Sequence, residues 1–275
     1  MTNDELIINN ACGMLDTADR KALWDAAIAL VDARSVIMIL TEIVGRAIGS
    51  VGGSAADFIQ EKFGLDLKAK TEEAAEAILW KIHSGATIGM DSSSETERWE
   101  WFHKLAATVS GASAGFVGAP GLAWDLPFTT GIIMRSVADI ARSFPDETLE
   151  SEDTRRACIE VFAFGGPQKD DDDAETGYFA VRSTLSHARI DQLIRVVATS
   201  FGGALSEKFL AQAVPIAGIL AGGGLNYAFI DYYQQMARVH FAIRGVERRY
   251  ADREAVRACF SEQVKKIKEE RRLKK

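Results

Sequence analysis

Apolar residues recur along the chain with the spacing of α-helices. One window places apolar side chains on a single helix face, at Leu23, Ala26, Ala27, Leu30 and Val31. A second window repeats this spacing at Ile190, Leu193, Ile194, Val197, Ala198 and Phe201. No segment sustains the two-residue alternation of a β-strand, and the nearest, residues 35–40, continues a helical pattern without a turn signal. The pattern therefore predicts an all-α fold, a multi-helix bundle.

Clustered glycines predict two glycine-rich helical hairpins within this bundle. Glycines follow each other at four-residue spacing, at Gly45, Gly49 and Gly53, at Gly111 and Gly115, and at Gly218 and Gly222. A glycine inside a helix costs about 1 kcal/mol relative to alanine. We expect close approach between helix backbones to offset that cost.

Two of the glycine clusters lie in charge-free stretches, residues 105–124 and 209–230. Both stretches are long enough to span a bilayer. Each contains a proline and many small residues, so transfer into lipid is only weakly favourable. Three alternatives stay open: a transmembrane span, a hairpin buried in the protein core, and reversible insertion into a membrane.

Turn signals predict several helix boundaries. Gly165 to Pro167 can end a helix that starts near Ser151, and residues 166–177 form a surface loop with a run of four aspartates. Pro127 predicts a bend after Asp125, because the residue before a proline is disfavoured in helical geometry. In the helix that follows, Asp139 can pair with Arg135 and Arg142 at i, i+4 and i, i+3 spacing.

Charge and cysteine content exclude some classes of function. The net charge of −7 argues against a nucleic-acid partner, which needs clustered positive charge. Cys12, Cys158 and Cys259 lie far apart and form no CxxC pair, so we expect reduced, buried thiols. The N-terminus has acids and no basic residue before its apolar run, unlike a secretory signal. We therefore expect a cytoplasmic protein.

The C-terminal residues 262–275 form a basic tail. They hold seven basic and three acidic side chains, which leaves a net charge of −11 for the rest of the chain. Such a helix can contact anionic lipid head groups, each cation adding about 1 kcal/mol. The alternative is a solvated helix end.

Two segments resemble the signature of the EcsC protein family. They are GASAGFVGAPGLAWDLPFTTGIIMRSVADIARSF, residues 111–144, and VPIAGILAGGGLNYAFIDYYQQMARVHFAIRGVERRY, residues 214–250. The resemblance implies a helical domain at residues 71–250, with an N-terminal helical extension at 1–70 packed on it and a basic C-terminal helix at 251–275. The family takes its name from a protein encoded beside the subunits of a bacterial ABC exporter, and the resemblance implies no particular reaction. The polar residues that match its pattern are the candidate binding residues, Lys81, Asp125, Arg135, Asp139, Asn226 and Arg244.

The favoured function is that of a non-enzymatic accessory protein, peripheral to the inner face of a membrane. Its expected partner is anionic lipid or a membrane protein such as a transporter component, and no cofactor or metal is expected. The alternative is a hydrolase. Ser113 lies in a GxSxG pattern, which needs a preceding strand that the sequence does not predict, and His83 with Asp91 could contribute to a metal site.

Overall fold

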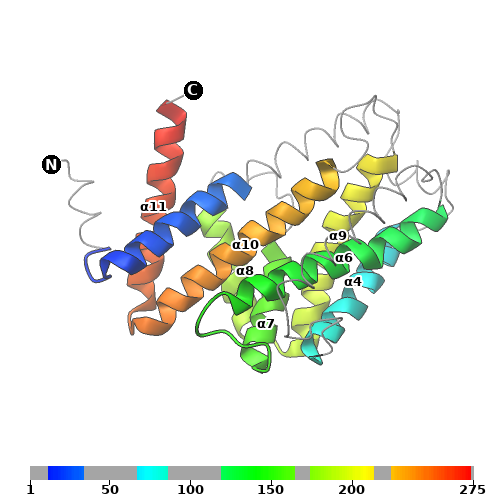
Figure 1. Ribbon diagram of the computed structural model, residues 1–275, viewed down its shortest axis with the longest axis horizontal. Coiled ribbons are helices and arrows are strands. Elements are labelled where there is room, and N and C mark those ends of the chain that lie inside the picture. The colour runs from blue at the N-terminus through cyan, green and yellow to red at the C-terminus, as the bar shows by residue number, and fades with distance from the viewer. Residues whose placement is uncertain (1–11, 34–66, 86–118, 165–173, 214–223, 274–275) are drawn as a thin grey trace, which may run out of the picture.

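The computed structural model describes residues 12–33, 67–85, 119–164, 174–213 and 224–273, which form a bundle of helices (Figure 1). The helices are the N-terminal helix (residues 17–33), α4 (Leu67–His83), α6 (Ala119–Arg142), α7 (Glu152–Val161), the short 3₁₀ helix η1 (Phe162–Phe164), α8 (Ala174–Ser186), α9 (Ile190–Ala213), α10 (Gly224–Arg249) and α11 (Arg253–Leu273). No strand occurs in these ranges, and the predicted all-α class is confirmed. None of the described helices combines the length and apolar character needed to cross a bilayer.

The bundle is built around a cluster of aromatic rings. The ring of Phe162 in η1 lies 4.8 Å from that of Phe201 in α9 and 5.6 Å from that of Tyr233 in α10. All three side chains are fully buried. Each buried aromatic ring removes 150–250 Å² from water, so this cluster holds three helices together at the centre of the molecule.

Helices α4 and α9 pack side by side along much of their length (Figure 1). Their backbones meet at Gly202, where a Cβ atom would lie only 2.7 Å from Cα of Glu72. No side chain fits at that distance, so Gly202 permits the close approach. This is the role that the sequence predicted for helical glycines, found here at one position.

The two periodic windows form helices with the predicted buried faces. In the helix of residues 17–33, Leu23, Ala27 and Leu30 are at most 1 % exposed.

Helix α7 begins after Ser151, as predicted. The predicted loop at 166–177 is too long, because α8 begins at Ala174. Alanine and glutamate at 174 and 175 are better helix formers than the aspartates before them.

The predicted bend at Asp125 to Pro127 is wrong, because α6 runs without interruption from Ala119 to Arg142. A proline removes a single backbone donor, and its effect on the preceding residue disfavours helical geometry without forbidding it. The helix continues through Pro127 and packs along α10. Packing therefore outweighs the local preference.

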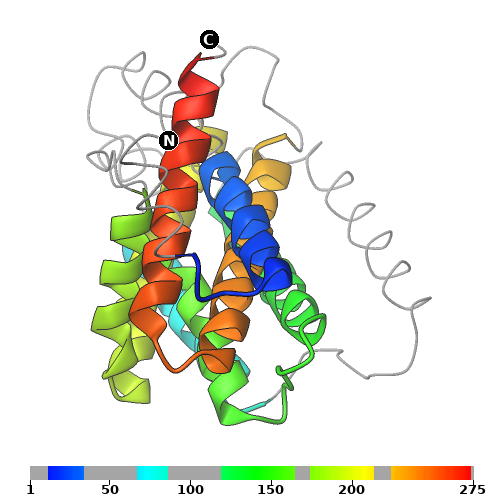
Figure 2. The same ribbon diagram turned by 90° about the vertical axis from the view of Figure 1, so that its left-hand side faces the viewer.

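The N-terminal helix lies beside α11, the last helix of the chain (Figure 2). A disulfide joins Cys12 to Cys259 of α11, with their Cα atoms 4.8 Å apart. The expectation of three reduced thiols is therefore wrong for this pair, because α11 packs beside the N-terminal helix and brings distant residues into contact. Disulfides persist mainly in oxidising compartments, which weighs against the expected cytoplasmic location. Cys158 is a free, buried thiol, and burial raises its pKa to about 12.

Most of the predicted hairpin glycines lie outside the described residues, as do residues 105–118 and 214–223 of the charge-free stretches. The structure therefore leaves the two glycine-rich hairpins as a prediction. Among the described glycines, Gly85 has a φ of 73° at the end of α4, and its N–H donates to the carbonyl of Ile82. A glycine is the residue best suited to this left-handed helix end.

Candidate functional site

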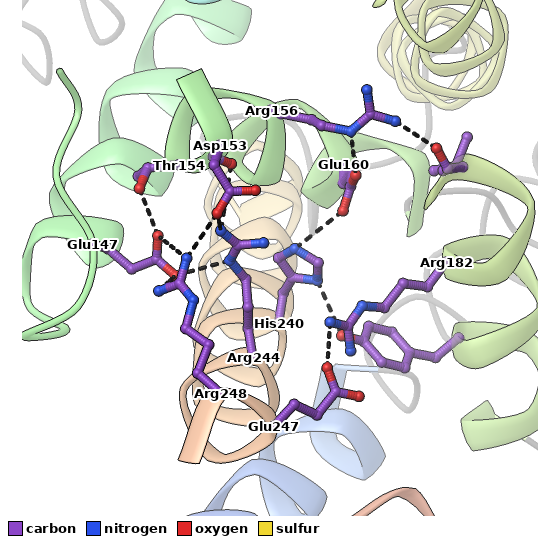
Figure 3. Close-up of polar contacts among 12 residues, drawn as sticks. Glu147, Asp153, Thr154, Arg156, Glu160, Arg182, His240, Arg244, Glu247 and Arg248 are labelled. Carbon is purple, nitrogen blue, oxygen red and sulfur yellow. Dashed lines mark hydrogen bonds and ion pairs between the residues drawn. The ribbon is translucent and has the colours of Figure 1, made fainter. Parts of the chain in front are cut away.

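Helix α10 carries a row of ionisable side chains along one face (Figure 3). The row comprises His240, Arg244, Glu247 and Arg248, at spacings of four, three and one residue, so the side chains project in related directions. His240 is fully buried and Glu247 is 4 % exposed. Buried charges are costly unless they are paired, and each of these side chains has partners on another element.

Arg244 and Arg248 hold the segment between α6 and α7. Nε of Arg244 donates to Oε1 of Glu147 at 2.8 Å, and the same guanidinium pairs with Asp153. Nη2 of Arg248 donates to Oδ2 of Asp153 at 2.9 Å. Thr154 completes the cluster, because its hydroxyl donates to Oε2 of Glu147 at 2.6 Å. Both oxygens of the buried Glu147 carboxylate are therefore bonded.

His240 and Glu247 join α10 to α7 and α8. Nδ1 of His240 lies 3.0 Å from the hydroxyl of Tyr178, and its Nε2 lies 3.5 Å from Oε2 of Glu160. Nη2 of Arg182 in α8 donates to Oε2 of Glu247 at 2.5 Å. One row on α10 thus bonds to the segment before α7, to α7, to α8 and, through Arg257, to α11.

Burial and charge shift the pKa values in this network. Burial lowers the pKa of His240 well below 6.5, and the nearby Arg182 lowers it further. Burial raises the pKa of Glu160, although Arg156 and Arg182 oppose that shift. Each shift favours the neutral form of its group, while Nε of Arg156 donates to Oε1 of Glu160 at 3.2 Å and opposes the shift there. Burial alone would raise the pKa of Asp153, but hydrogen bonds from Arg244 and Arg248 lower it overall.

This network links helices through buried ion pairs and hydrogen bonds. His240 has no exposed surface, so a reactant would reach it only if the helices separated. His187 is exposed and contacts Ser186, its neighbour in the chain. Ser113 and Asp91 lie outside the described residues. In the part of the chain that is described, no three His, Cys, Asp or Glu side chains gather as metal ligands.

An open groove of about 710 Å³ lies between the N-terminal helix, α6 and α10. Its apolar lining consists of Ala22, Ala26, Ile28, Ala29, Ile140, Phe144 and Ala242. Three carboxylates, from Asp25, Asp32 and Asp139, and one guanidinium, from Arg238, also line it. The groove is within the size range of ligand and helix-binding sites. It is accessible, unlike the charged network.

The last turns of α11 present a basic band. Lys265, Lys268 and Arg272 follow one another at i, i+3 and i+7, and Lys265 and Arg272 are exposed. The opposite face of α11 is buried through Val256, Phe260, Val264 and Ile267. The end of α11 extends beyond the neighbouring described helices in both views (Figures 1 and 2). The band is therefore held outward by packing of the other face.

The six candidate binding residues do not form one described site. Arg135 and Asp139 are neighbours on α6, and the predicted pairing of Asp139 with Arg135 and Arg142 is confirmed. Arg244 belongs to the charged network, whereas Lys81 is exposed near the end of α4. The backbones of Asp125 and Asn226 lie in α6 and α10, but their side chains are outside the described part. Their joint binding role stays a prediction.

Sequence reasoning missed most of the charged network. It named Arg244 but neither its partner Glu147 nor Glu160. One signal was present: ionisable residues on α10 alternate with the apolar Phe241, Ile243 and Val246, all of which are buried. Ionisable residues between buried apolar ones on both sides indicate buried ion pairs. The partners themselves give no such signal, since they lie about 60 to 100 residues away.

Comparisons with known proteins agree with the resemblance found in the sequence. The family model for the EcsC protein family matches residues 60–246, about two thirds of the chain. No curated protein and no solved structure matches. The match covers α4 to most of α10, and it leaves the N-terminal helix and α11 outside.

Proposed function

We propose that this chain, which belongs to the EcsC protein family, is a non-enzymatic binding protein that associates with anionic membrane surfaces through the end of α11. The observation that carries the proposal is the basic band of Lys265, Lys268 and Arg272 on an otherwise acidic chain. Leu273, 88 % exposed, follows the band and adds an apolar side chain at the same end.

The expected attraction is weak and reversible. A cation near an anionic surface contributes about 1 kcal/mol, so the three residues of the band supply about 3 kcal/mol. The remainder of the chain is negative and is repelled, which orients the molecule with the end of α11 toward the lipid. Such binding falls steeply with salt, because the Debye length shortens from about 10 Å at 0.1 M to about 3 Å at 1 M.

The interior supports a binding role over catalysis. Ionisable groups with shifted pKa values often mark active sites, but Glu160 and His240 are buried inside the helix network. Their partners tie α10 to α7 and α8, which is a packing role. The groove and the end of α11 both carry accessible polar groups that can contact a partner.

The test is flotation of the purified protein with vesicles of anionic or neutral lipid, at low and high salt. We expect flotation with anionic vesicles at low salt only. The triple variant Lys265→Glu, Lys268→Glu and Arg272→Glu should stay with the soluble fraction.

The matched control reverses three exposed cations elsewhere, Lys68→Glu, Lys70→Glu and Arg195→Glu, and should float like the unmodified protein. Far-UV circular dichroism of each variant establishes that it is folded. Equal loss of flotation in both triple variants, or no flotation of the unmodified protein, would overturn the proposal. Salt-resistant flotation would also overturn it, and would favour insertion of an apolar segment.

A further inference from the structure

We propose that the groove between the N-terminal helix, α6 and α10 binds a cationic amphipathic helix of a protein at the membrane surface. This inference rests on the proposed function, because the contact of α11 with lipid brings the groove to such a helix. The occupant follows from three properties of the groove: its small apolar lining, its charge, and its place beside the basic band.

The apolar lining suits a helix. Four of its residues are alanines, two of which, Ala22 and Ala29, are half-buried and lie on the N-terminal helix. Small side chains let a second helix backbone approach closely, and the larger Ile140 and Phe144 provide an apolar wall. An amphipathic helix bound in a groove buries one apolar face in this way.

The charge of the groove selects a cationic partner. Asp25, Asp32 and Asp139 line the groove together with one cation, Arg238. Asp139 is already paired with two arginines of its own helix, so Asp25 and Asp32 are the carboxylates on which a cationic partner depends. The carboxylates of Asp25 and Asp32 are each more than half exposed, and they pair with Lys21 and Arg271 at 2.6 Å and 2.5 Å. Exposed pairs of this kind contribute little to stability, so lysines or arginines of a partner can replace the internal cations.

The groove lies beside the surface proposed to contact lipid. Asp32 lines the groove, and it forms its ion pair with Arg271, one residue before Arg272 of the basic band. Amphipathic helices that lie on a membrane surface are rich in lysine and arginine on their polar face. The two surfaces therefore have complementary tasks: the basic band meets anionic head groups, and the acidic groove meets a cationic helix near them.

The experiment uses a fluorescein-labelled helical peptide with leucines on one face and lysines on the other. Its binding to the full chain is measured by fluorescence anisotropy without vesicles, so the result does not depend on lipid contact. We expect saturable binding. The double variant Asp25→Lys and Asp32→Lys should bind the peptide about ten-fold more weakly. Ala29→Trp, which fills the groove without changing charge, should also weaken binding.

A second charge reversal controls for general attraction to an acidic protein. Glu73→Lys and Glu254→Lys change the same number of charges at side chains that are 74 % and 86 % exposed and that do not line the groove. Equal weakening by both double variants would overturn the inference, as would undiminished binding to Ala29→Trp or no binding at all. If the peptide binds in the groove but the protein does not float with vesicles, the proposed function fails and the groove stands.

Discussion

Replacement of Gly202 by alanine provides a direct test of how α4 and α9 pack. The new Cβ atom would lie 2.7 Å from Cα and 2.8 Å from the backbone nitrogen of Glu72. Neither backbone atom can move without shifting α4, so the helices must separate. Overpacking of this kind costs about 1 to 3 kcal/mol.

Gly203→Ala is the matched control, because no atom lies within 4 Å of the position where its Cβ would be built. Both glycines lie inside α9, so each substitution gains about 1 kcal/mol of helix propensity. That gain cancels when the two variants are compared. Gly203→Ala should therefore be more stable than Gly202→Ala by about 1 to 3 kcal/mol.

The assay is thermal and urea unfolding followed by far-UV circular dichroism. A difference of 1 kcal/mol corresponds to about 2 to 4 °C in Tm for a chain of this size. Gly203→Ala should unfold at or above the temperature of the unmodified protein, and Gly202→Ala below Gly203→Ala. Equal stability of the two variants would refute the argument that Gly202 is required for close approach.

Three further predictions concern the covalent and ionic links. Replacement of Cys12 by serine should lower the free energy of unfolding by up to about 5 kcal/mol, because the disulfide to Cys259 closes a loop with a sequence separation of 247. The unmodified protein, purified without reductant and then unfolded, should titrate as a single free thiol, and three free thiols would contradict the bond. Glu147→Ala should cost about 1 to 3 kcal/mol in urea unfolding, since it removes the 2.8 Å partner of the largely buried Arg244 and leaves that side chain only its pair with Asp153; a loss no larger than that of the exposed pairs would contradict the packing role. Because Arg244 holds the pKa of Asp153 below its ordinary value of 3.8, this pair stabilises the fold above pH 3.8 and the contribution disappears as the pH falls through the folded pKa; unfolding curves of Asp153→Asn should depend less on pH in that range, and an unchanged acid dependence would be evidence against the pair.

The helices were predictable where the signal is local. The apolar spacing around Leu23 and around Ile194 depends on residues within two or three turns, and both windows form helices with the expected buried faces. The start of α7 at Ser151 and the pairing of Asp139 with its neighbours are local in the same sense. Interactions across three or four residues can be inferred without the fold.

Predictions failed where packing between distant segments decides the outcome. The bend at Pro127 follows a real backbone preference, but α6 remains straight enough to be one helix along α10. The disulfide depends on the N-terminal helix lying beside α11. The partners Glu147 and Arg244 are 97 residues apart. Neither the spacing of residue types nor the composition of the chain predicts these long-range contacts, because the contacts form only when the helices pack together.

The proposed binding surfaces depend on helices outside the region that matches the family model. The family match ends at residue 246, so the N-terminal helix and α11 lie outside it. Yet the N-terminal helix forms one wall of the groove, and α11 carries the basic band. The Cys12–Cys259 disulfide and the Asp32–Arg271 ion pair join these two helices to each other. The aromatic cluster and most of the charged network therefore lie within the family match, whereas the binding proposed for this chain depends on its two terminal helices acting as a connected pair.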